Sequence, residues 1–194
     1  LLADKGDADA MLALGKLSLK NNPKDAFAWI EKAAAKGNIA AETHLAQASF
    51  DGNAVKKDLP KALKLALAAA EKKDVAAMTL VGKMYYEGAG VEKSTGKAMK
   101  YLLVPAGQGE PYAVEKVGRM LYDARDYANA EKYLENAVKQ NKDGEDMFRL
   151  GMIAYRGDGV KQDFSKALDW FMQAVEKKNS DAMTLVGRMH YRGD

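Results

Sequence analysis

The chain has 194 residues, 47% of them hydrophobic and 29% charged, and its 30 basic and 27 acidic side chains give a net charge of +3. This composition excludes a disordered chain, and the near balance of charge argues against a dedicated nucleic-acid binder or a protein of anionic membranes. The absence of cysteine excludes disulfides, thiol catalysis and thiolate metal sites. No apolar run approaches the ~20 residues that span a bilayer, so we expect no membrane insertion.

Two short patterns recur along the whole chain. In the first, an apolar residue precedes a small one, and the small residues stand 31, 36, 36, 33 and 36 positions apart: Gly15, Ala46, Gly82, Gly118, Gly151 and Gly187. In the second, an alanine has a large apolar residue three positions later: Ala26/Trp29, Ala62/Leu65, Ala98/Tyr101, Ala130/Tyr133 and Ala167/Trp170. Repetition at this period is typical of a solenoid.

Both patterns lie in stretches with helical spacing of apolar residues, such as 74–88 and 164–179, so each unit should contain two helices. We expect an all-α, right-handed α/α superhelix in one repeat domain, residues 1–194. Its hairpins should occupy residues 7–38, 39–74, 75–110, 111–142 and 143–180, with a partial unit at 181–194 and another at the N-terminus. The partial units predict that the chain is a piece of a longer array.

Local signals support the second helices. Four residues before each alanine of the second pattern stands a good N-cap residue: Asn22, Asp58, Ser94, Asp126 and Asp163. Pro105 should kink or shorten its helix. Glycine inside a helix costs about 1 kcal/mol relative to alanine, so close approach of the paired helix should offset it. We expect the alanines of the second pattern to be the facing small residues.

Residues 85–102, YYEGAGVEKSTGKAMKYL, contain motifs that invite a catalytic interpretation. A phosphate-binding loop needs four residues between its first Gly and the Gly-Lys pair, whereas Gly90 and Gly96 enclose five and Ala98 follows Lys97. Ser94 and Lys97 form a Ser-x-x-Lys motif, but its companions Ser-Asp-Asn and Lys-Thr-Gly are absent. We therefore predict that Ser94 caps a helix.

Other isolated motifs also have structural explanations. His44 and His190 have no second ligand at a suitable spacing, so we expect no metal site. The Arg-Gly-Asp sequence at 192–194 could indicate adhesion. The same triplet at 156–158 occupies an equivalent repeat position, where glycine should begin a turn.

The third and fifth units, at 76–102 and 145–171, resemble the Sel-like repeat (SLR) family, a relative of the tetratricopeptide repeat. The shared pattern is Leu/Val-Gly, Gly-x-Gly-Val, Lys-Ala, an aromatic residue and Ala. The first and fourth units lack the Gly-x-Gly-Val loop, and 11 and 12 residues separate their markers instead of 16. The resemblance implies an adaptor that binds proteins, in bacteria often in the envelope or periplasm or after secretion. It also implies an alternative, since some members are similar to immunity proteins that neutralise secreted toxins.

By analogy to tetratricopeptide repeats, the first helices should line a concave binding face. Cations and tyrosines on that face would suit protein recognition. The candidate partner-binding residues are Leu12, Lys16, Thr43, Gln47, Thr79, Lys83, Tyr86, Glu115, Arg119, Tyr122, Phe148, Met152, Tyr155, Thr184 and Arg188. We expect the aromatic residues among them to be half-buried.

The sequence and this resemblance therefore predict an adaptor that binds another protein and has no catalytic residue, cofactor or metal. They leave the oligomeric state open and favour a monomer. The alternative is an inhibitor or immunity protein that would plug the active site of a secreted toxin, such as a lipase-type effector. An enzyme is a third, more distant hypothesis.

Overall fold

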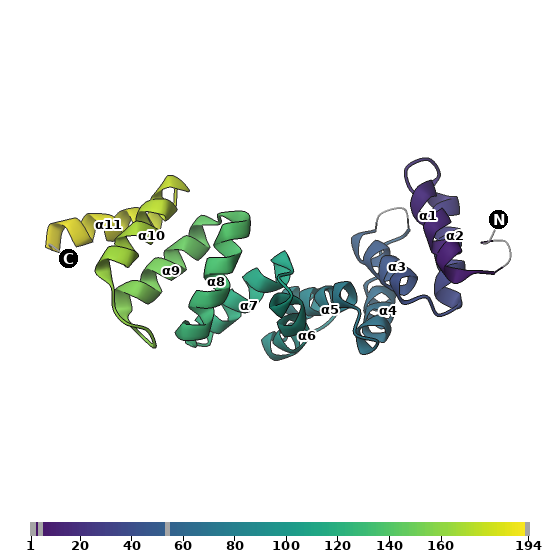
Figure 1. Cartoon of the computed structure of the whole chain (residues 1–194), viewed down its shortest axis with the longest axis horizontal. Helices are drawn as coiled ribbons and strands as arrows, with labels where there is room; N and C mark the ends of the chain where they lie inside the picture. The colour runs from purple at the N-terminus through teal and green to yellow at the C-terminus, as the bar shows by residue number, and fades with distance from the viewer. Residues whose placement is uncertain (1–2, 4–5, 53–54, 193–194) are drawn as a thin grey trace. The chain divides into compact units, whose positions relative to one another are not determined.

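We analysed a computed structural model of the protein, which describes residue 3 and residues 6–52 and 55–192. The described residues form helices and no strand, which confirms the all-α class (Figure 1). The helices are α1 Ala8–Ser18, α2 Pro23–Ala35, α3 Ile39–Asp51, α4 Leu59–Glu71, α5 Val75–Glu87, α6 Thr95–Gly107, α7 Pro111–Asp123, α8 Tyr127–Asn141, α9 Gly144–Arg156, α10 Phe164–Glu176 and α11 Ser180–Arg192. Among the described residues, none of these helices combines the length and the apolar character needed to cross a membrane.

The chain divides into two compact units, Leu1–Pro105 and Ala106–Asp194, and the division falls inside α6. Pro105 lacks the N–H that would bond the carbonyl of Tyr101. Nevertheless, α6 has 13 residues, the same length as α4 and α10. Of the two effects expected of Pro105, shortening is therefore excluded.

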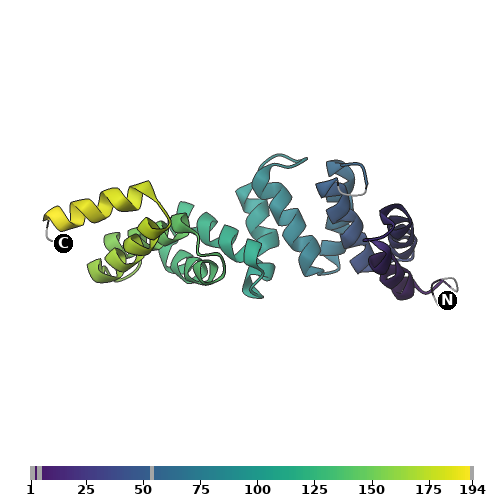
Figure 2. The ribbon, with the colours of Figure 1, turned by 90° about the horizontal axis from the view of Figure 1, so that it is seen from above.

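Within each unit, consecutive helices pair as antiparallel hairpins, which both ribbon views show (Figure 2). In the first unit α1 packs on α2 and α3 on α4, and in the second α7 packs on α8 and α9 on α10. The last helix of one hairpin then packs on the first helix of the next, as α4 does on α5 and α8 on α9. This chain of local contacts is the arrangement of a helical repeat solenoid.

Four glycines of the first pattern, all except Gly187, receive a large side chain from the second helix. A Cβ at Gly15 would lie 2.6 Å from Ile30 Cγ1, and one at Gly118 would lie 3.1 Å from Leu134 Cδ2. Leu102 and Phe171 fill the equivalent space over Gly82 and Gly151.

The expectation that an alanine faces each glycine is therefore incomplete. The contacting side chain stands four residues after that alanine, because one helical turn brings it onto the same face. Only backbone oxygens of the alanines come near, such as Ala26 O at 2.9 Å from the Cβ position of Gly15. The second repeat, residues 39–74, has two alanines at these positions. Ala46 replaces the glycine, and Ala66 stands where the other repeats have Ile, Leu or Phe. Both alanines are fully buried in one cluster.

The predicted N-caps are confirmed. The side chains of Asp58 and Asp163 accept hydrogen bonds from the N–H groups of Lys61 at 2.9 Å and Lys166 at 2.8 Å. Ser94 Oγ accepts from Lys97 N–H at 3.3 Å. Asn22 and Asp126 cap α2 and α8 in the same way. Ser94 thus has the structural role that its repeat position predicts.

Caps of the first helices also connect neighbouring hairpins. Asn38 caps α3 and donates to Asp9 Oδ1 of α1 at 2.6 Å, and Asp74, the cap of α5, accepts from Thr43 of α3 at 3.1 Å. Asn179, before α11, likewise donates to Glu145 of α9 at 3.1 Å. These bonds fix the spacing between successive first helices.

The Arg-Gly-Asp triplet at 156–158 forms a turn, as predicted. Gly157 ends α9 with φ +71°, a left-handed conformation that favours glycine. In the second triplet, residues 193–194 lie outside the described residues.

Candidate functional site

The predicted binding residues all lie on first helices, α1, α3, α5, α7, α9 and α11. Four are exposed: Lys16, Gln47, Thr184 and Arg188. Ten are half-buried, including all the aromatic ones: Thr43, Thr79, Lys83, Tyr86, Glu115, Arg119, Tyr122, Phe148, Met152 and Tyr155. Leu12 is only 8% exposed and packs in the core, so it offers a partner little surface.

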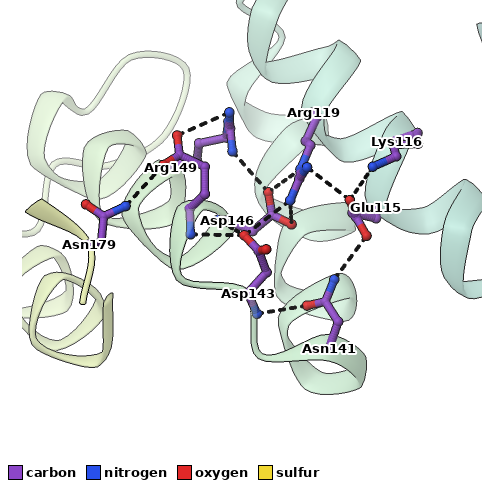
Figure 3. Close-up of polar contacts among 9 residues, drawn as sticks. Glu115, Lys116, Arg119, Asn141, Asp143, Asp146, Arg149 and Asn179 are labelled. Atoms are coloured by element: carbon purple, nitrogen blue, oxygen red, sulfur yellow. Dashed lines mark hydrogen bonds and ion pairs between the residues drawn. The ribbon is translucent and has the colours of Figure 1, made fainter. Parts of the chain in front are cut away.

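The strongest polar interaction on these helices joins Arg119 of α7 to Asp146 of α9 (Figure 3). Arg119 Nε donates to Asp146 Oδ1 at 2.7 Å, and Nη2 donates to Oδ2 at 3.1 Å. Asp146 is completely buried, whereas the Arg119 side chain is 20% exposed. This is a bidentate pair, the strongest arrangement of these two groups.

Further side chains complete the coordination of Arg119. Its Nη1 lies 3.0 Å from Glu115 Oε1, and its Nη2 lies 3.2 Å from Asp143 Oδ1. Asn141 donates to Glu115 Oε2 at 3.2 Å and accepts from the Asp143 N–H at 3.0 Å. Arg119 therefore contacts three carboxylates, and the sequence pattern did not predict these contacts.

Arg149 extends the same group of contacts along α9. Its Nη1 donates to Asp146 Oδ1 at 3.2 Å, and its Nη2 lies 3.2 Å from Glu145 Oε1. Asn179, which precedes α11, then donates to Glu145 Oε2 at 3.1 Å. We call this set the Arg119 network: Glu115, Arg119, Asn141, Asp143, Glu145, Asp146, Arg149 and Asn179.

The electrostatics of the pair follow from burial and hydrogen bonding. Burial raises the pKa of Asp146, and the hydrogen bonds and charge of Arg119 oppose that rise. Burial also tends to lower the pKa of Arg119, but the bond to Asp146 and the carboxylates of Glu115 and Asp143 outweigh it, so this pKa is raised. Arg119 therefore stays charged and holds Asp146 in place.

Sequence reasoning missed Asp146 and Arg149, although a signal for Asp146 was present. Asp146 stands five residues before Gly151. The same position in each of the other sequence repeats holds an alanine: Ala10, Ala41, Ala77, Ala113 and Ala182. A carboxylate at a buried alanine position requires a cation nearby. Arg119 of the preceding sequence repeat supplies this cation.

Aromatic residues of the second unit pack against one another, and Tyr122 among them also contacts this network. Tyr122 makes an edge contact with Tyr127, their ring centroids 5.4 Å apart, and the Arg149 guanidinium lies 5.8 Å from the Tyr122 centroid. Burial raises the pKa of Tyr122. Tyr155 contacts Phe164 edge to face at 5.3 Å. These rings are held in place before any partner arrives.

The predicted residues of the first unit are arranged more simply. Lys83 Nζ lies 5.0 Å from the Phe50 centroid, and Lys93 Nζ lies 5.8 Å from that of Tyr86. Gln47 donates to Asp51 at 2.8 Å. The Thr79 hydroxyl bonds the backbone carbonyl of Val75 on its own helix.

Within the described part of the chain, no group of three or more His, Asp or Glu side chains is arranged to hold a metal ion. His190 Nδ1 lies 2.9 Å from the Val186 carbonyl of its own helix. Burial and Lys16 lower the pKa of His44, against a smaller opposing effect of Asp74.

Comparison with known proteins identifies the repeat. The Sel1 repeat model matches residues 8–38, 39–74, 75–103, 144–179 and 180–194. The chain belongs to the Sel1 repeat family. Sel1 repeat proteins are generally protein-interaction adaptors. The unmatched segment contains the fourth unit, whose markers are only 12 residues apart.

Solved Sel1 structures share this fold. A protective antigen of uropathogenic Escherichia coli, which displays an SLR fold, superimposes with a TM-score of 0.79 at 26% identity over 98% of this chain. A Sel1 repeat protein from Oxalobacter formigenes gives 0.68 at 26% identity, covering 97% of this chain and 80% of that one. The chain spans 43% of the E. coli antigen.

One curated relative is similar over a shorter segment. It is the ERAD-associated E3 ubiquitin-protein ligase component HRD3A of Arabidopsis thaliana, 40% identical over 48 residues. The match covers 24% of this chain and 7% of that protein.

Proposed function

We propose that this Sel1 repeat protein is a non-catalytic adaptor that binds another protein through its first-helix face. The term covers a separate face on each unit: the predicted residues on α1, α3 and α5 in the first unit, without Leu12, and those on α7, α9 and α11 in the second. The supporting observation is the Arg119 network, because it immobilises side chains of α7 and α9 before a partner binds. Preorganised side chains lose less conformational entropy on association.

The chemistry of the face also favours a protein partner. Tyr122, Phe148, Met152 and Tyr155 combine half-buried bodies with accessible edges. Exposed Arg188 adds a cation on α11. Aromatic residues, Met and Arg are the residue types enriched in protein interfaces.

The same contacts argue against catalysis. Asp146 has a raised pKa, which is common for a catalytic acid. However, its carboxylate is fully buried and bonded to two arginines, so a substrate cannot reach it. Ser94, the other candidate, accepts a hydrogen bond from the Lys97 N–H and caps α6, which is a structural role.

Affinity capture with a charge-reversed first-helix face tests the proposal. Arg119 is unsuitable for this purpose, since its loss would leave Asp146 buried without its main partner. The test variant is Lys83→Glu with Arg188→Glu, one substitution in each unit. The control is Lys64→Glu with Lys132→Glu, which makes the same charge change on exposed residues of the second helices α4 and α8.

We expect wild type and control to capture the same partner from the cells that produce the protein. The test variant should bind it at least about tenfold more weakly. Equal capture by all three proteins would contradict the first-helix face. If the captured partner is a hydrolase that loses activity on binding, the adaptor role is wrong and the inhibitor role is correct.

A further inference from the structure

A hollow of about 380 Å³ lies between α8, α9 and α10 of the second unit. Val138 and Met147, which are 5% and 4% exposed, form its apolar floor. Half-buried Trp170 forms one wall. The volume falls within the ~300–1,000 Å³ typical of ligand sites. Most of its lining comes from the second helices, so it is distinct from the first-helix face.

Three exposed lysines surround this hollow: Lys139, Lys142 and Lys177. None of them forms an ion pair with any residue that the structure describes. Other cations of this unit, such as Lys166, bind carboxylates, in that case Glu131 at 2.8 Å and Glu135 at 3.0 Å. The rim therefore has a positive charge that the described chain does not neutralise.

Helix electrostatics account for only part of this arrangement. Lys139 lies in the last turn of α8, and Lys142 and Lys177 are the C-caps of α8 and α10, where a cation is favourable. One cation at each helix end would be enough for that effect, yet three converge on one apolar hollow. Glu176 is the single acidic residue of the lining.

We propose that this hollow binds an acidic segment of a protein, which places one apolar side chain against Trp170, Val138 and Met147. The lysines would pair with carboxylates on either side of that apolar residue. A long polyanion such as a nucleic acid is less suitable, because residues 106–194 carry 15 acidic and 14 basic side chains. A short acidic segment can bind the three rim lysines without being repelled by the surrounding carboxylates, whereas a long polyanion cannot.

Selection from a random peptide library displayed on phage tests this proposal with the whole chain. The test variant is Lys139→Gln, Lys142→Gln and Lys177→Gln, and the control is Arg125→Gln, Lys132→Gln and Lys161→Gln, three exposed cations of the same unit outside the hollow. Peptides recovered by wild type and control but not by the test variant should be rich in Asp and Glu around one apolar residue. Their affinity should fall at least about tenfold in the test variant.

Tryptophan fluorescence locates the binding. The chain has two tryptophans, so Trp29→Phe leaves Trp170 as the sole reporter. A selected peptide should change the emission of Trp170, and replacing the apolar residue of the peptide by Ser should abolish the change.

Three results would each overturn the proposal. They are failure to select lysine-dependent peptides, selected peptides without acidic residues, and stronger lysine-dependent binding to duplex DNA than to the peptides. Loss of this site would leave partner capture by the first-helix face unchanged, so the two proposals fail separately.

Discussion

The ring of Phe171 occupies the space that a side chain at Gly151 would need. A Cβ at position 151 would lie 2.5 Å from Phe171 Cδ1, which is closer than real Cβ contacts allow. At Gly187, the equivalent position of α11, no described atom comes within 4 Å of the added Cβ. Among the described residues, the close contact at this repeat position is therefore present at Gly151 and absent at Gly187.

Gly151→Ala should destabilise the protein by about 1–3 kcal/mol, because the core must shift to admit the methyl group. Gly187→Ala should be neutral or stabilise it by up to about 1 kcal/mol, since alanine is the better helix former. Chemical denaturation followed by circular dichroism measures both. Equal effects at the two positions would show that the contact with Phe171 does not determine the choice of glycine.

Arg119→Met should lower the free energy of unfolding by about 3 kcal/mol, because it leaves Asp146 buried with only Arg149 as a cationic partner. Asp146→Ala should cost less, since it restores the residue of the other units and Arg119 keeps Glu115 and Asp143. In the double variant, the cost of Arg119→Met should largely disappear. A double-mutant cycle from denaturant titrations checks this, and strict additivity of the two changes would contradict the coupling.

Ser94→Ala should cost about 1 kcal/mol by removing the cap of α6, and Ser94→Asp should preserve stability. Asp163→Ala, at the equivalent position before α10, provides the comparison and should have a similar cost. Thermal unfolding measures all three variants. Full stability of Ser94→Asp together with a loss in Ser94→Ala would support the capping role, and an equal loss in both variants would contradict it.

Stability of the first unit should fall as the pH drops below 6.5. The folded-state pKa of His44 is lowered by burial and by Lys16, against the opposing charge of Asp74, so the folded state favours neutral imidazole. The stability that neutral His44 contributes is fully present above its ordinary pKa of 6.5. This stability is lost as the pH falls through the lowered folded-state pKa. Denaturation midpoints at pH 7.5 and 5.0 should differ less in His44→Gln than in wild type. An undiminished difference in that variant would exclude His44 as the source, and His190→Gln is the control.

The hairpins were predictable because their signals are local: apolar residues at helical spacing, glycine markers and cap residues such as Asp58 and Asp163. The contact of Gly151 with Phe171 was not, since the second pattern drew attention to Ala167 one turn earlier. All the predicted binding residues were also assigned correctly to first helices. Periodicity identifies a shared face, but it does not show which side chain of the next repeat reaches it, and so the contact of Arg119 with Asp146 was not predicted.

The side chain at the small-residue position of a first helix matches in size the side chain that faces it on the second helix, and this limits how the gene can recombine. Gly151 leaves the space that Phe171 fills, whereas Ala46 shares its cluster with the small side chain of Ala66. A crossover in the loop inside a hairpin would join a glycine to an alanine, leaving a void, or an alanine to a phenylalanine, causing a clash. A crossover between hairpins would keep each matched couple intact, so duplication and recombination should preserve whole hairpins as the units of inheritance.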